Sequence, residues 1–597
     1  MLNFQKPDVE QFFQTLNITD FVISPDEKQL VITTNINGHF NLWGMDLPNQ
    51  YPYPMTFRNQ RSHALHYDQK GEFLIAGFDN DGDENIQLYA LQPRGGSLLP
   101  IRVEEGEKHY FSSLSEDGKR LYYTSSKENP TYLNGYCYNL ETEEVTTLIK
   151  GSEAPIEIIA VSQDEEDFIY TKHYSNTHTP VFVRSHGEDL ALTPPSEKEF
   201  MVYEALFVTS DSVYFTTNFE SNYSYLAKFN LHTKHFSKVL ELEQEDLTSV
   251  KADKENHRLY LVSTSGVEDR LFVYDLSREA YDLKKIPVNL IDKLAISETG
   301  NLYILGDGST SPANIYFQTH EGDEWEKLTN NVVPGISEDM LIEPEVIRYP
   351  SYDGLEIEGL FYRAHEENSN GHVIHWPHGG PQSAERKMYW SLYQFLLHRG
   401  YSIFAPNFRG STGYGLEFMK MVEQDWGFGP RLDNVKGIEW LVSNGYVDSD
   451  KVLLMGGSYG GYMALLLHGR HAEYYKAVVD IFGPGNLFSF IDSVPDHWKP
   501  SMAKFVGDPV EQKDKLTEDS PITYLKGMKK PMLVIQGAND PRVVKAESDQ
   551  IVEALKKEGS QVEYMVLEDE GHGFSKKENE INVYKKILHF LDQQLIQ

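Results

Sequence analysis

The sequence has one cysteine, few basic side chains and no long apolar run. The single cysteine, Cys137, excludes an intrachain disulfide and gives no sign of an oxidising compartment. The 54 Lys and Arg stand against 90 Asp and Glu, a formal net charge of −36, which argues against nucleic acid or an anionic membrane as a partner. No window approaches the roughly 18 apolar residues of a membrane span, and residues 1–8 lack the pattern of a signal peptide. We therefore expect a cytoplasmic protein.

The first half of the chain is repetitive. A compact core stops growing at roughly 250–300 residues, so 597 residues predict two large domains. Before residue 335, short alternating segments recur with a turn of the Ser-x-Asp-Gly type, followed by an apolar strand start. These strand starts are 43 to 48 residues apart and fall at positions 30, 73, 121, 168, 213, 259 and 302. A period near 45 with about four short strands per unit predicts an all-β propeller with seven blades.

Two other interpretations of this half are less favoured. A β-sandwich also has frequent turns, but it does not account for seven evenly spaced copies. The acidic run at 79–84 resembles a calcium loop, yet Glu84 and Ala90 occupy the positions where an EF-hand has Gly and Glu. We interpret this run as a solvated hairpin tip.

From about residue 336 the pattern changes to strand, turn and helix. Such alternation predicts a mainly parallel sheet covered on both faces, with its chemistry at the carboxyl ends of the strands. The apolar strand 452–455 runs directly into Gly-Gly-Ser-Tyr-Gly-Gly at 456–461 and then into a helical run. This context predicts a nucleophile elbow that holds the Ser458 hydroxyl above the sheet. The alternative, a passive serine in a glycine-rich turn, does not explain the strand and helix on either side.

A serine hydroxyl needs a base to become a good nucleophile, and the base needs a carboxylate to orient it. In this type of sheet the expected chain order is Ser, Asp, His. Asp540 follows the strand 532–535, and His572 follows the strand 563–567. The acids at 568–570 compete with Asp540, but they precede His572 on its own loop. We therefore predict a catalytic triad of Ser458, Asp540 and His572.

The tetrahedral intermediate also needs an oxyanion hole. One donor is expected to be the backbone N–H of Tyr459, and the other comes from the His-Gly-Gly-Pro loop at 378–381. A metal site is the competing interpretation, because His372, His375 and His378 recur every third residue. On an extended strand this spacing alternates faces, so we predict no metal, and the mechanism requires no cofactor.

Four blocks of sequence carry a family resemblance over residues 340–597. They are 378–381 (His-Gly-Gly-Pro), 407–415 (Asn-Phe-Arg-Gly-Ser-Thr-Gly-Tyr-Gly), 456–461, and 540–542 with 571–573. In order and spacing they resemble the prolyl oligopeptidase family of serine peptidases, and within it the acylaminoacyl-peptidase-like branch. The resemblance implies a propeller capping an α/β-hydrolase, short peptides as substrates, and an active site in the cavity between the two domains.

The resemblance also implies roles for particular residues. Arg542 is expected to bind a substrate carbonyl, and the N–H of Gly380 is expected to donate to the oxyanion. Residues 9–16 are expected to form a helix that packs back on the hydrolase domain. Dipeptidyl-peptidase relatives anchor the substrate amine with paired glutamates in an aromatic context, which the sequence does not show.

The combined prediction is a serine peptidase of two domains. Its expected parts are an N-terminal helix (1–20), a propeller (21–335) and a catalytic α/β-hydrolase (336–597). The predicted activity is release of N-acylated amino acids from blocked peptides; a broader oligopeptidase, a dipeptidyl peptidase and a carboxylesterase stay open as alternatives. A propeller scaffold with an inactive hydrolase is disfavoured by the intact triad. A homo-oligomer is expected from the resemblance, and residues 482–505 are a candidate lid.

Overall fold

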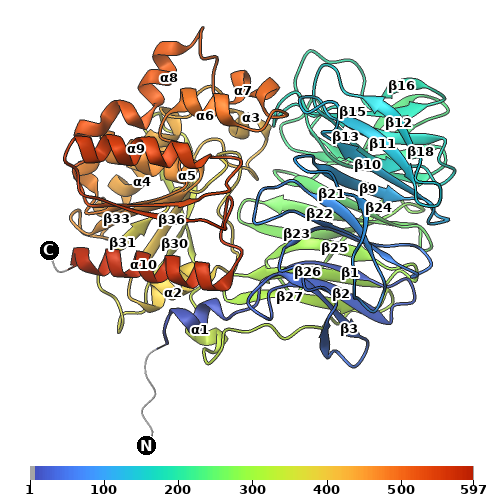
Figure 1. The fold of residues 1–597 in the computed structure, drawn as a ribbon, viewed down its shortest axis with the longest axis horizontal. Helices are drawn as coiled ribbons and strands as arrows, with labels where there is room; N and C mark the ends of the chain where they lie inside the picture. The colour runs from blue at the N-terminus through green and yellow to red at the C-terminus, as the bar shows by residue number, and fades with distance from the viewer. Residues whose placement is uncertain (1–6, 596–597) are drawn as a thin grey trace, which may run out of the picture.

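The computed structural model describes residues 7–595, which form two domains side by side (Figure 1). The first contains seven four-stranded antiparallel sheets arranged as blades, which confirms the predicted seven-bladed propeller. The strands of blades 1 to 4 are β1 (Ile18–Ile23), β2 (Gln29–Thr34), β3 (Asn41–Asp46) and β4 (Pro52–Pro54); β5 (Ser62–Tyr67), β6 (Leu74–Phe78), β7 (Gln87–Leu91) and β8 (Leu99–Arg102); β9 (His109–Leu114), β10 (Arg120–Ser125), β11 (Asn134–Asn139) and β12 (Val145–Lys150); β13 (Ile156–Val161), β14 (Asp167–Lys172), β15 (Val181–Ser185) and β16 (Glu188–Ala191). Those of blades 5 to 7 are β17 (Val202–Thr209), β18 (Ser212–Thr217), β19 (Tyr225–Asn230) and β20 (His235–Leu240); β21 (Asp246–Asp253), β22 (Arg258–Ser265), β23 (Glu268–Asp275) and β24 (Ala280–Lys284); β25 (Leu290–Ile296), β26 (Leu302–Gly308), β27 (Ser311–Gln318) and β28 (Glu326–Lys327).

The repeated turn joins the first two strands of a blade. In its clearest copies a serine hydroxyl donates to the aspartate two residues later and accepts a backbone N–H five residues later. This arrangement occurs at Ser24 with Asp26, Ser115 with Asp117, and Ser162 with Asp164. The register between the first and second strands shifts in all seven blades, and such irregularities increase the twist of a strand pair. The sequence repeat therefore encodes a closed turn and a twisted blade.

The second domain is built on one eight-stranded sheet in the order β29-β30-β32-β31-β33-β34-β35-β36. From β32 onward, neighbouring strands are parallel, as the alternation of strands and helices predicts. The strands are β29 (Glu345–Pro350), β30 (Glu356–Tyr362), β31 (Val373–His375), β32 (Ser402–Asn407), β33 (Val452–Gly457), β34 (Val478–Ile481), β35 (Met532–Gly537) and β36 (Val562–Leu567). The helices are η1 (Glu338–Met340), α2 (Ser391–His398), α3 (Leu416–Lys420), α4 (Gly429–Ser443), α5 (Tyr459–Arg470), η2 (Ala472–Tyr474), α6 (Leu487–Ser493), α7 (Lys499–Phe505), α8 (Lys513–Asp519), η3 (Pro521–Gly527), α9 (Lys545–Lys557) and α10 (Lys577–Leu595).

A short N-terminal helix, α1 (Val9–Phe13), lies against the hydrolase domain between α2 and α10 (Figure 1). Asp8 caps it, and the Phe13 ring stacks on Tyr584 of α10 with centroids 4.5 Å apart. The first propeller strand begins at Ile18, and the hydrolase sheet begins at Glu345. We retain the boundaries 1–20, 21–335 and 336–597 as a proposal.

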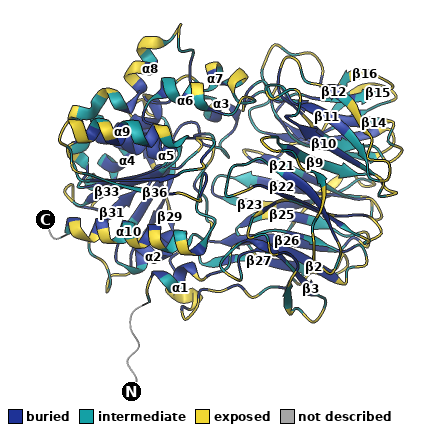
Figure 2. Ribbon diagram, in the orientation of Figure 1, coloured by how far each residue is buried: buried dark blue, intermediate teal, exposed yellow. Residues whose placement is uncertain are grey.

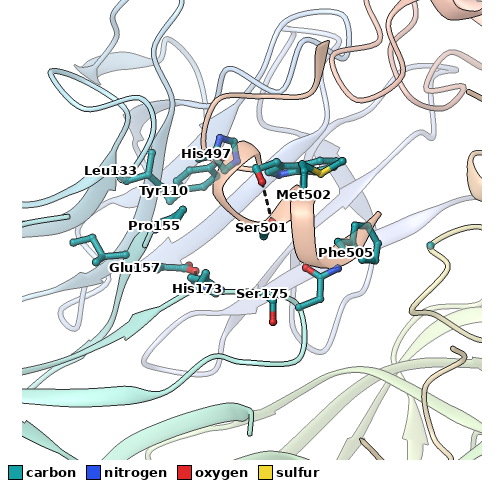
Figure 3. A pocket seen from close by; sticks show the side chains of 14 residues that line it. Tyr110, Leu133, Pro155, Glu157, His173, Ser175, His497, Ser501, Met502 and Phe505 are labelled. Atoms are coloured by element: carbon teal, nitrogen blue, oxygen red, sulfur yellow. Dashed lines mark hydrogen bonds and ion pairs between the residues drawn. The ribbon is translucent and has the colours of Figure 1, made fainter. Parts of the chain in front are cut away.

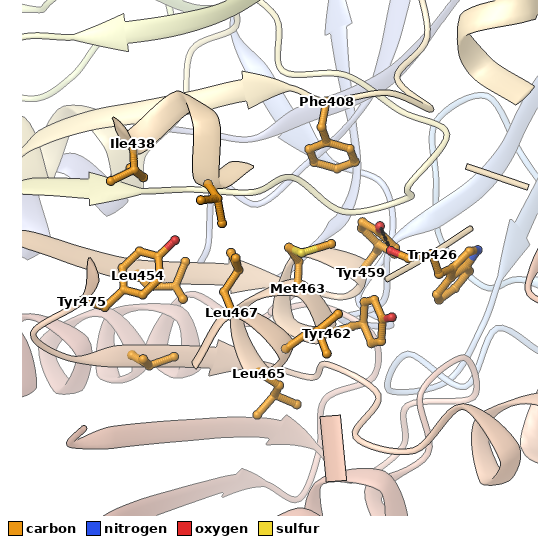
Figure 4. Packing of buried hydrophobic residues seen from close by; sticks show 14 of the residues in the cluster. Phe408, Trp426, Ile438, Leu454, Tyr459, Tyr462, Met463, Leu465, Leu467 and Tyr475 are labelled. Carbon is orange, nitrogen blue, oxygen red and sulfur yellow. Dashed lines mark hydrogen bonds between the residues drawn. The ribbon is translucent and has the colours of Figure 1, made fainter. Parts of the chain in front are cut away.

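The central strands of both domains are buried, while exposed residues lie on outer helices, on turns and on the outermost strands of several blades, such as β8, β12, β16 and β24 (Figure 2). Helix α5, which follows the predicted nucleophile, is buried throughout residues 459–468. A helix that is apolar on all sides belongs in a core, and α5 packs between Tyr475, Leu454 and Trp426 (Figure 4). This packing fixes the start of α5, where the predicted active site lies. Within residues 7–595, no helix combines the length and apolar content that a bilayer crossing needs.

Candidate active site

Ser458 lies on a sharp turn between β33 and α5. Its backbone has φ 58° and ψ −122°, a conformation that side-chain-bearing residues rarely adopt. The turn requires glycines nearby, because a Cβ on Gly460 would overlap the carbonyl of Pro377 and one on Gly456 would overlap Gly460. The predicted elbow geometry is therefore present at the carboxyl end of β33.

The loops after β35 and β36 bring Asp540 and His572 to Ser458. Nε2 of His572 lies 3.0 Å from the Ser458 hydroxyl oxygen, and Nδ1 lies 2.6 Å from Oδ2 of Asp540. The other carboxylate oxygen of Asp540 accepts the backbone N–H groups of Arg542 at 2.9 Å and Val543 at 3.0 Å. The Asp540 side chain is fully buried and that of His572 is 9% exposed. Because Oδ1 is held by the backbone, Oδ2 is directed at the imidazole.

Two of the three acids that precede His572, Asp569 and Glu570, have other partners. Asp569 pairs with Lys576 at 2.6 Å, and Glu570 accepts the backbone N–H groups of Ser575 and Lys576. Neither carboxylate is hydrogen-bonded to His572. The imidazole is packed instead against Phe482, with ring centroids 4.5 Å apart.

The His-Gly-Gly-Pro loop lies beside the serine. A Cβ on Gly379 would come within 3.5 Å of the Ser458 Cβ, and Gly380 lines the adjoining cavity. His378 anchors the loop, because its ring nitrogens lie 2.8 Å from the Ser411 hydroxyl and 2.7 Å from the Gly379 carbonyl. Burial lowers the pKa of His378 to about 4, so it remains neutral. Among hydrogen bonds within residues 7–595, none is donated by the N–H of Gly380 or Tyr459, the two predicted oxyanion donors.

The histidines that suggested a metal site bond to different partners. His372 contacts the carbonyl of Asn370, and His375 lies between Tyr475 and Asn434. In the part of the chain that the structure describes, no three His, Cys, Asp or Glu side chains are grouped as a metal site needs.

The acidic run 79–84 is not the solvated tip that we expected. It forms the turn between β6 and β7, and this turn packs against the loops that carry Asp540 and His572. Gly82 approaches Gly571 so closely that a Cβ on Gly82 would lie 2.7 Å from the Gly571 nitrogen. Asp81 pairs with Lys576 at 2.9 Å, and its carbonyl accepts the side-chain amide of Asn539 at 3.3 Å. The propeller therefore contacts both loops directly.

Arg542, which is expected to bind a substrate carbonyl, pairs with Glu84 of the same turn at 2.7 Å. Its guanidinium also lies 5.9 Å from the centre of the Trp498 ring. The side chain is 45% exposed, so it remains accessible. Nothing in the local pattern of Glu84 distinguishes it from other turn acids, and sequence reasoning missed it.

A cavity of about 390 Å³ lies between the domains and includes Gly380 in its wall (Figure 3). The hydrolase side is mostly apolar, and the propeller side mixes polar and apolar residues. The hydrolase wall is formed by Gly380, His497, Trp498, Ser501, Met502 and Phe505, and the propeller wall by Tyr110, Leu133, Pro155, Ile156, Glu157, His173, Ser175 and Asn176. Part of the candidate lid at 482–505 therefore lines the cavity, whereas Phe490 is buried in the core against Trp426.

Comparisons with known proteins agree with this arrangement. Residues 388–597 match the profile of the prolyl oligopeptidase family. Dipeptidyl aminopeptidase BIII of Pseudoxanthomonas mexicana is 28% identical over 93% of this chain and 84% of its own length. The human acylamino-acid-releasing enzyme is 27% identical over 41% of this chain and 34% of its own length. A puromycin-hydrolyzing peptidase of Mycobacterium tuberculosis has the same fold, with a TM-score of 0.85, 18% identity, and coverage of 99% of this chain and 97% of that one. The carboxyl-terminal domain thus matches the prolyl oligopeptidase family of serine peptidases, and over most of its length the chain is similar to peptidases.

Proposed function

We propose that Ser458, His572 and Asp540 form the catalytic triad and cleave peptide bonds through an acyl-enzyme. The hydrogen-bonded chain from the Ser458 hydroxyl through His572 to buried Asp540 supports this assignment most directly. Nε2 takes the hydroxyl proton as the Ser458 oxygen attacks the carbonyl carbon. The same nitrogen then gives the proton to the leaving amine as the C–N bond breaks. Water, deprotonated by His572, hydrolyses the resulting ester, and Asp540 stabilises the imidazolium in each step.

We propose that the N–H groups of Gly380 and Tyr459 stabilise the negative oxygen of the tetrahedral intermediate. Two features support this: neither group donates within residues 7–595, and Tyr459 is the first residue of α5, where the helix dipole favours negative charge. Removing one such donor typically costs about 10²–10³ in kcat.

For the substrate we propose short peptides with a free amino terminus, from which a dipeptide is released. The observation that carries this is a carboxylate in the propeller wall of the cavity, Glu157, whose side chain is 50% exposed. The pKa of Tyr110 is raised by burial and by the charges of Glu157 and Glu84, while Arg542 lowers it, which indicates that these groups lie together. If Arg542 binds a substrate carbonyl, the free ammonium group of the same peptide would lie near the Glu157 carboxylate. Release of dipeptides is also the activity in the name of the relative that matches over 93% of the chain.

Release of N-acylated amino acids, the activity expected from the sequence, is the second candidate. It is favoured by the apolar wall formed by Trp498, Met502 and Phe505, which suits an acyl group better than a charged amine. A cytoplasmic location and a homo-oligomer remain proposals from the sequence, and light scattering of the purified protein would measure the second.

The test compares p-nitroaniline release from dipeptidyl anilides with free and with acetylated amino termini. We expect the free-amine series to be cleaved faster, and Ser458→Ala to abolish cleavage of both. Glu157→Gln, which keeps the shape but removes the charge, is expected to raise KM for free-amine substrates about 10- to 100-fold, because a charge-assisted hydrogen bond contributes about 1.5–3 kcal/mol. The acetylated series is the internal control and should be unaffected. Faster cleavage of the acetylated series, with no effect of Glu157→Gln, would establish the second candidate instead.

A further inference from the structure

The seam between the two domains is bonded at six of the seven blades. The bonded residues on the propeller side include at least one from each of blades 1, 2, 4, 5, 6 and 7, namely Gly38, Asp81, Thr177, Asn222, Asp269 and Asp307. Their partners are distributed over the hydrolase domain, from Arg386 and Tyr389 to Lys577. Relative motion of the domains at these points would break hydrogen bonds or ion pairs.

Blade 3 is different. Within residues 7–595, no hydrogen bond or ion pair joins β9 to β12, or the turns between them, to the hydrolase domain. The 390 Å³ cavity lies beside it, where Tyr110 and Leu133 of blade 3 face His497 and Met502 of the hydrolase domain, and residues 155–176 at blade 4 complete the propeller wall (Figure 3). Glu157 and His173 in its wall keep 50% and 43% of their side chains exposed, so solvent reaches the cavity.

On the hydrolase side of this gap, an ion pair to the propeller lies at the far end of α7. Lys504, near the end of α7, pairs with Glu199 of the propeller. The turn before α7 is bonded to itself, through the pair between Asp496 and Lys499 at 2.9 Å. Within residues 7–595, no hydrogen bond or ion pair joins the 496–499 turn to the propeller, so opening at this turn would break none of the bonds of the seam.

We propose that peptides reach Ser458 through this gap between blade 3 and the 496–499 turn. We call the gap the blade-3 portal. It rests on the proposed peptidase function, since it concerns access to the same site. The cavity behind it reaches Gly380, so a peptide that enters here meets the proposed oxyanion hole without passing the bonded part of the seam.

The competing route is the axis of the propeller. A hollow of about 940 Å³ on the propeller is lined by the repeated turns, including Ser115, Asp164 and Ser297. From there a peptide would have to pass the first strands of the blades, where ion pairs cross between neighbouring blades. Lys293 donates to Asp20 at 2.6 Å, and Lys251 pairs with Glu204. These pairs would have to break for each substrate.

The test is a reversible cross-link. In a Cys137→Ser background the chain has no other thiol, so cysteine pairs can be introduced specifically. Exposed Glu128 of blade 3 and exposed Asp496 of the turn are both replaced by cysteine and joined by bis-maleimides of several lengths that contain a cleavable disulfide. A matched pair, Glu268→Cys with Lys387→Cys, joins the domains at blade 6, where these two residues already pair. Mass spectrometry verifies each cross-link.

We expect the portal cross-link to lower kcat/KM for a peptide anilide at least about tenfold, and reductant to restore it, because access would be blocked without change to the catalytic groups. The blade-6 cross-link should leave kcat/KM within about twofold of the value for the same variant before cross-linking, because the seam at blade 6 stays closed during substrate entry. Undiminished turnover with the portal cross-linked would overturn the proposal, and so would equal loss with the blade-6 cross-link, which would indicate whole-domain separation. If the uncross-linked variants and the wild type cleave no peptide, the proposed function fails rather than the portal.

Discussion

The contact between Gly82 and Gly571 makes a quantitative prediction about catalysis. Gly82 has φ +78°, and a Cβ there would lie 2.7 Å from the nitrogen and 2.8 Å from the Cα of Gly571. Both atoms are backbone, so they cannot rotate away, and they belong to the residue just before His572. In Gly82→Ala the two loops must therefore separate by roughly 1 Å to reach an ordinary van der Waals distance.

A displacement of this size acts on the proposed catalytic base. Misplacing a reacting group by about 1 Å can cost about 10²-fold in rate, so we expect kcat of Gly82→Ala to fall by about 10- to 100-fold. The substitution also places a side chain at positive φ, which costs about 1–2 kcal/mol. Such a loss would lower Tm by only a few degrees, about 2–4 °C per kcal/mol for a domain of 150–250 residues.

Gly106→Ala is the matched control. Gly106 has φ +79°, but a Cβ there meets nothing within 4 Å, so this variant carries the same backbone strain without the overlap. The assay is kcat and KM for a peptide anilide, with Tm measured on the same samples. The reasoning is refuted if Gly82→Ala keeps kcat within about twofold of Gly106→Ala, since the contact would then not position the His572 loop.

Three further predictions concern charge. Asp540→Asn should lower kcat about 10⁴-fold with KM little changed, because the amide favours the wrong imidazole tautomer. Steady-state kinetics would show a much smaller loss of kcat if a neighbouring acid took over the role of Asp540. Glu84→Gln should leave Tm nearly unchanged, since partly exposed ion pairs contribute about 0–1 kcal/mol, while KM for free-amine substrates rises; an unchanged KM would exclude Glu84 from substrate binding. Burial raises the pKa of Asp480 to about 8, above its ordinary value near 4, so the folded state holds this proton more tightly than the unfolded state. The contribution of this carboxyl group to stability is therefore complete below pH 4 and is lost as pH rises to 8, because the free energy of unfolding falls by up to about 1.4 kcal/mol per pH unit. The Tm of Asp480→Asn should consequently fall less steeply than that of the wild type between pH 5 and 8.

The proposed catalytic residues could be chosen from the sequence because the topology of the sheet restricts where such residues can lie. Parallel strands end at one edge, so residues that directly follow β33, β35 and β36 must come together there. Ser458, Asp540 and His572 each occupy such a position, and the structure brings them within hydrogen-bonding distance. The propeller was predictable for a similar reason, since each repeated Ser and Asp closes the same local turn.

The contribution of the propeller to the site could not be predicted in this way. Asn539 and Asp81 are in contact although 458 positions separate them, and no local pattern marks either residue. An acidic turn such as 79–84 satisfies its own hydrogen bonds whether it is solvated or docked, so its composition does not distinguish the two states. Only the packing of one domain on the other decides this, and that packing depends on side chains scattered over both domains.

The unpredicted contacts form one system with the predicted triad. Blade 2 holds the loops that carry Asp540 and His572, and blade 4 places Glu157 in the cavity. Blade 3, between them, forms no hydrogen bond or ion pair with the hydrolase domain within residues 7–595. A propeller that only covered the site would have no reason to differ from blade to blade along the seam. Because bonded blade 2 adjoins the loops of Asp540 and His572 and unbonded blade 3 adjoins the cavity, the same domain can keep the proposed triad assembled while a peptide enters beside it.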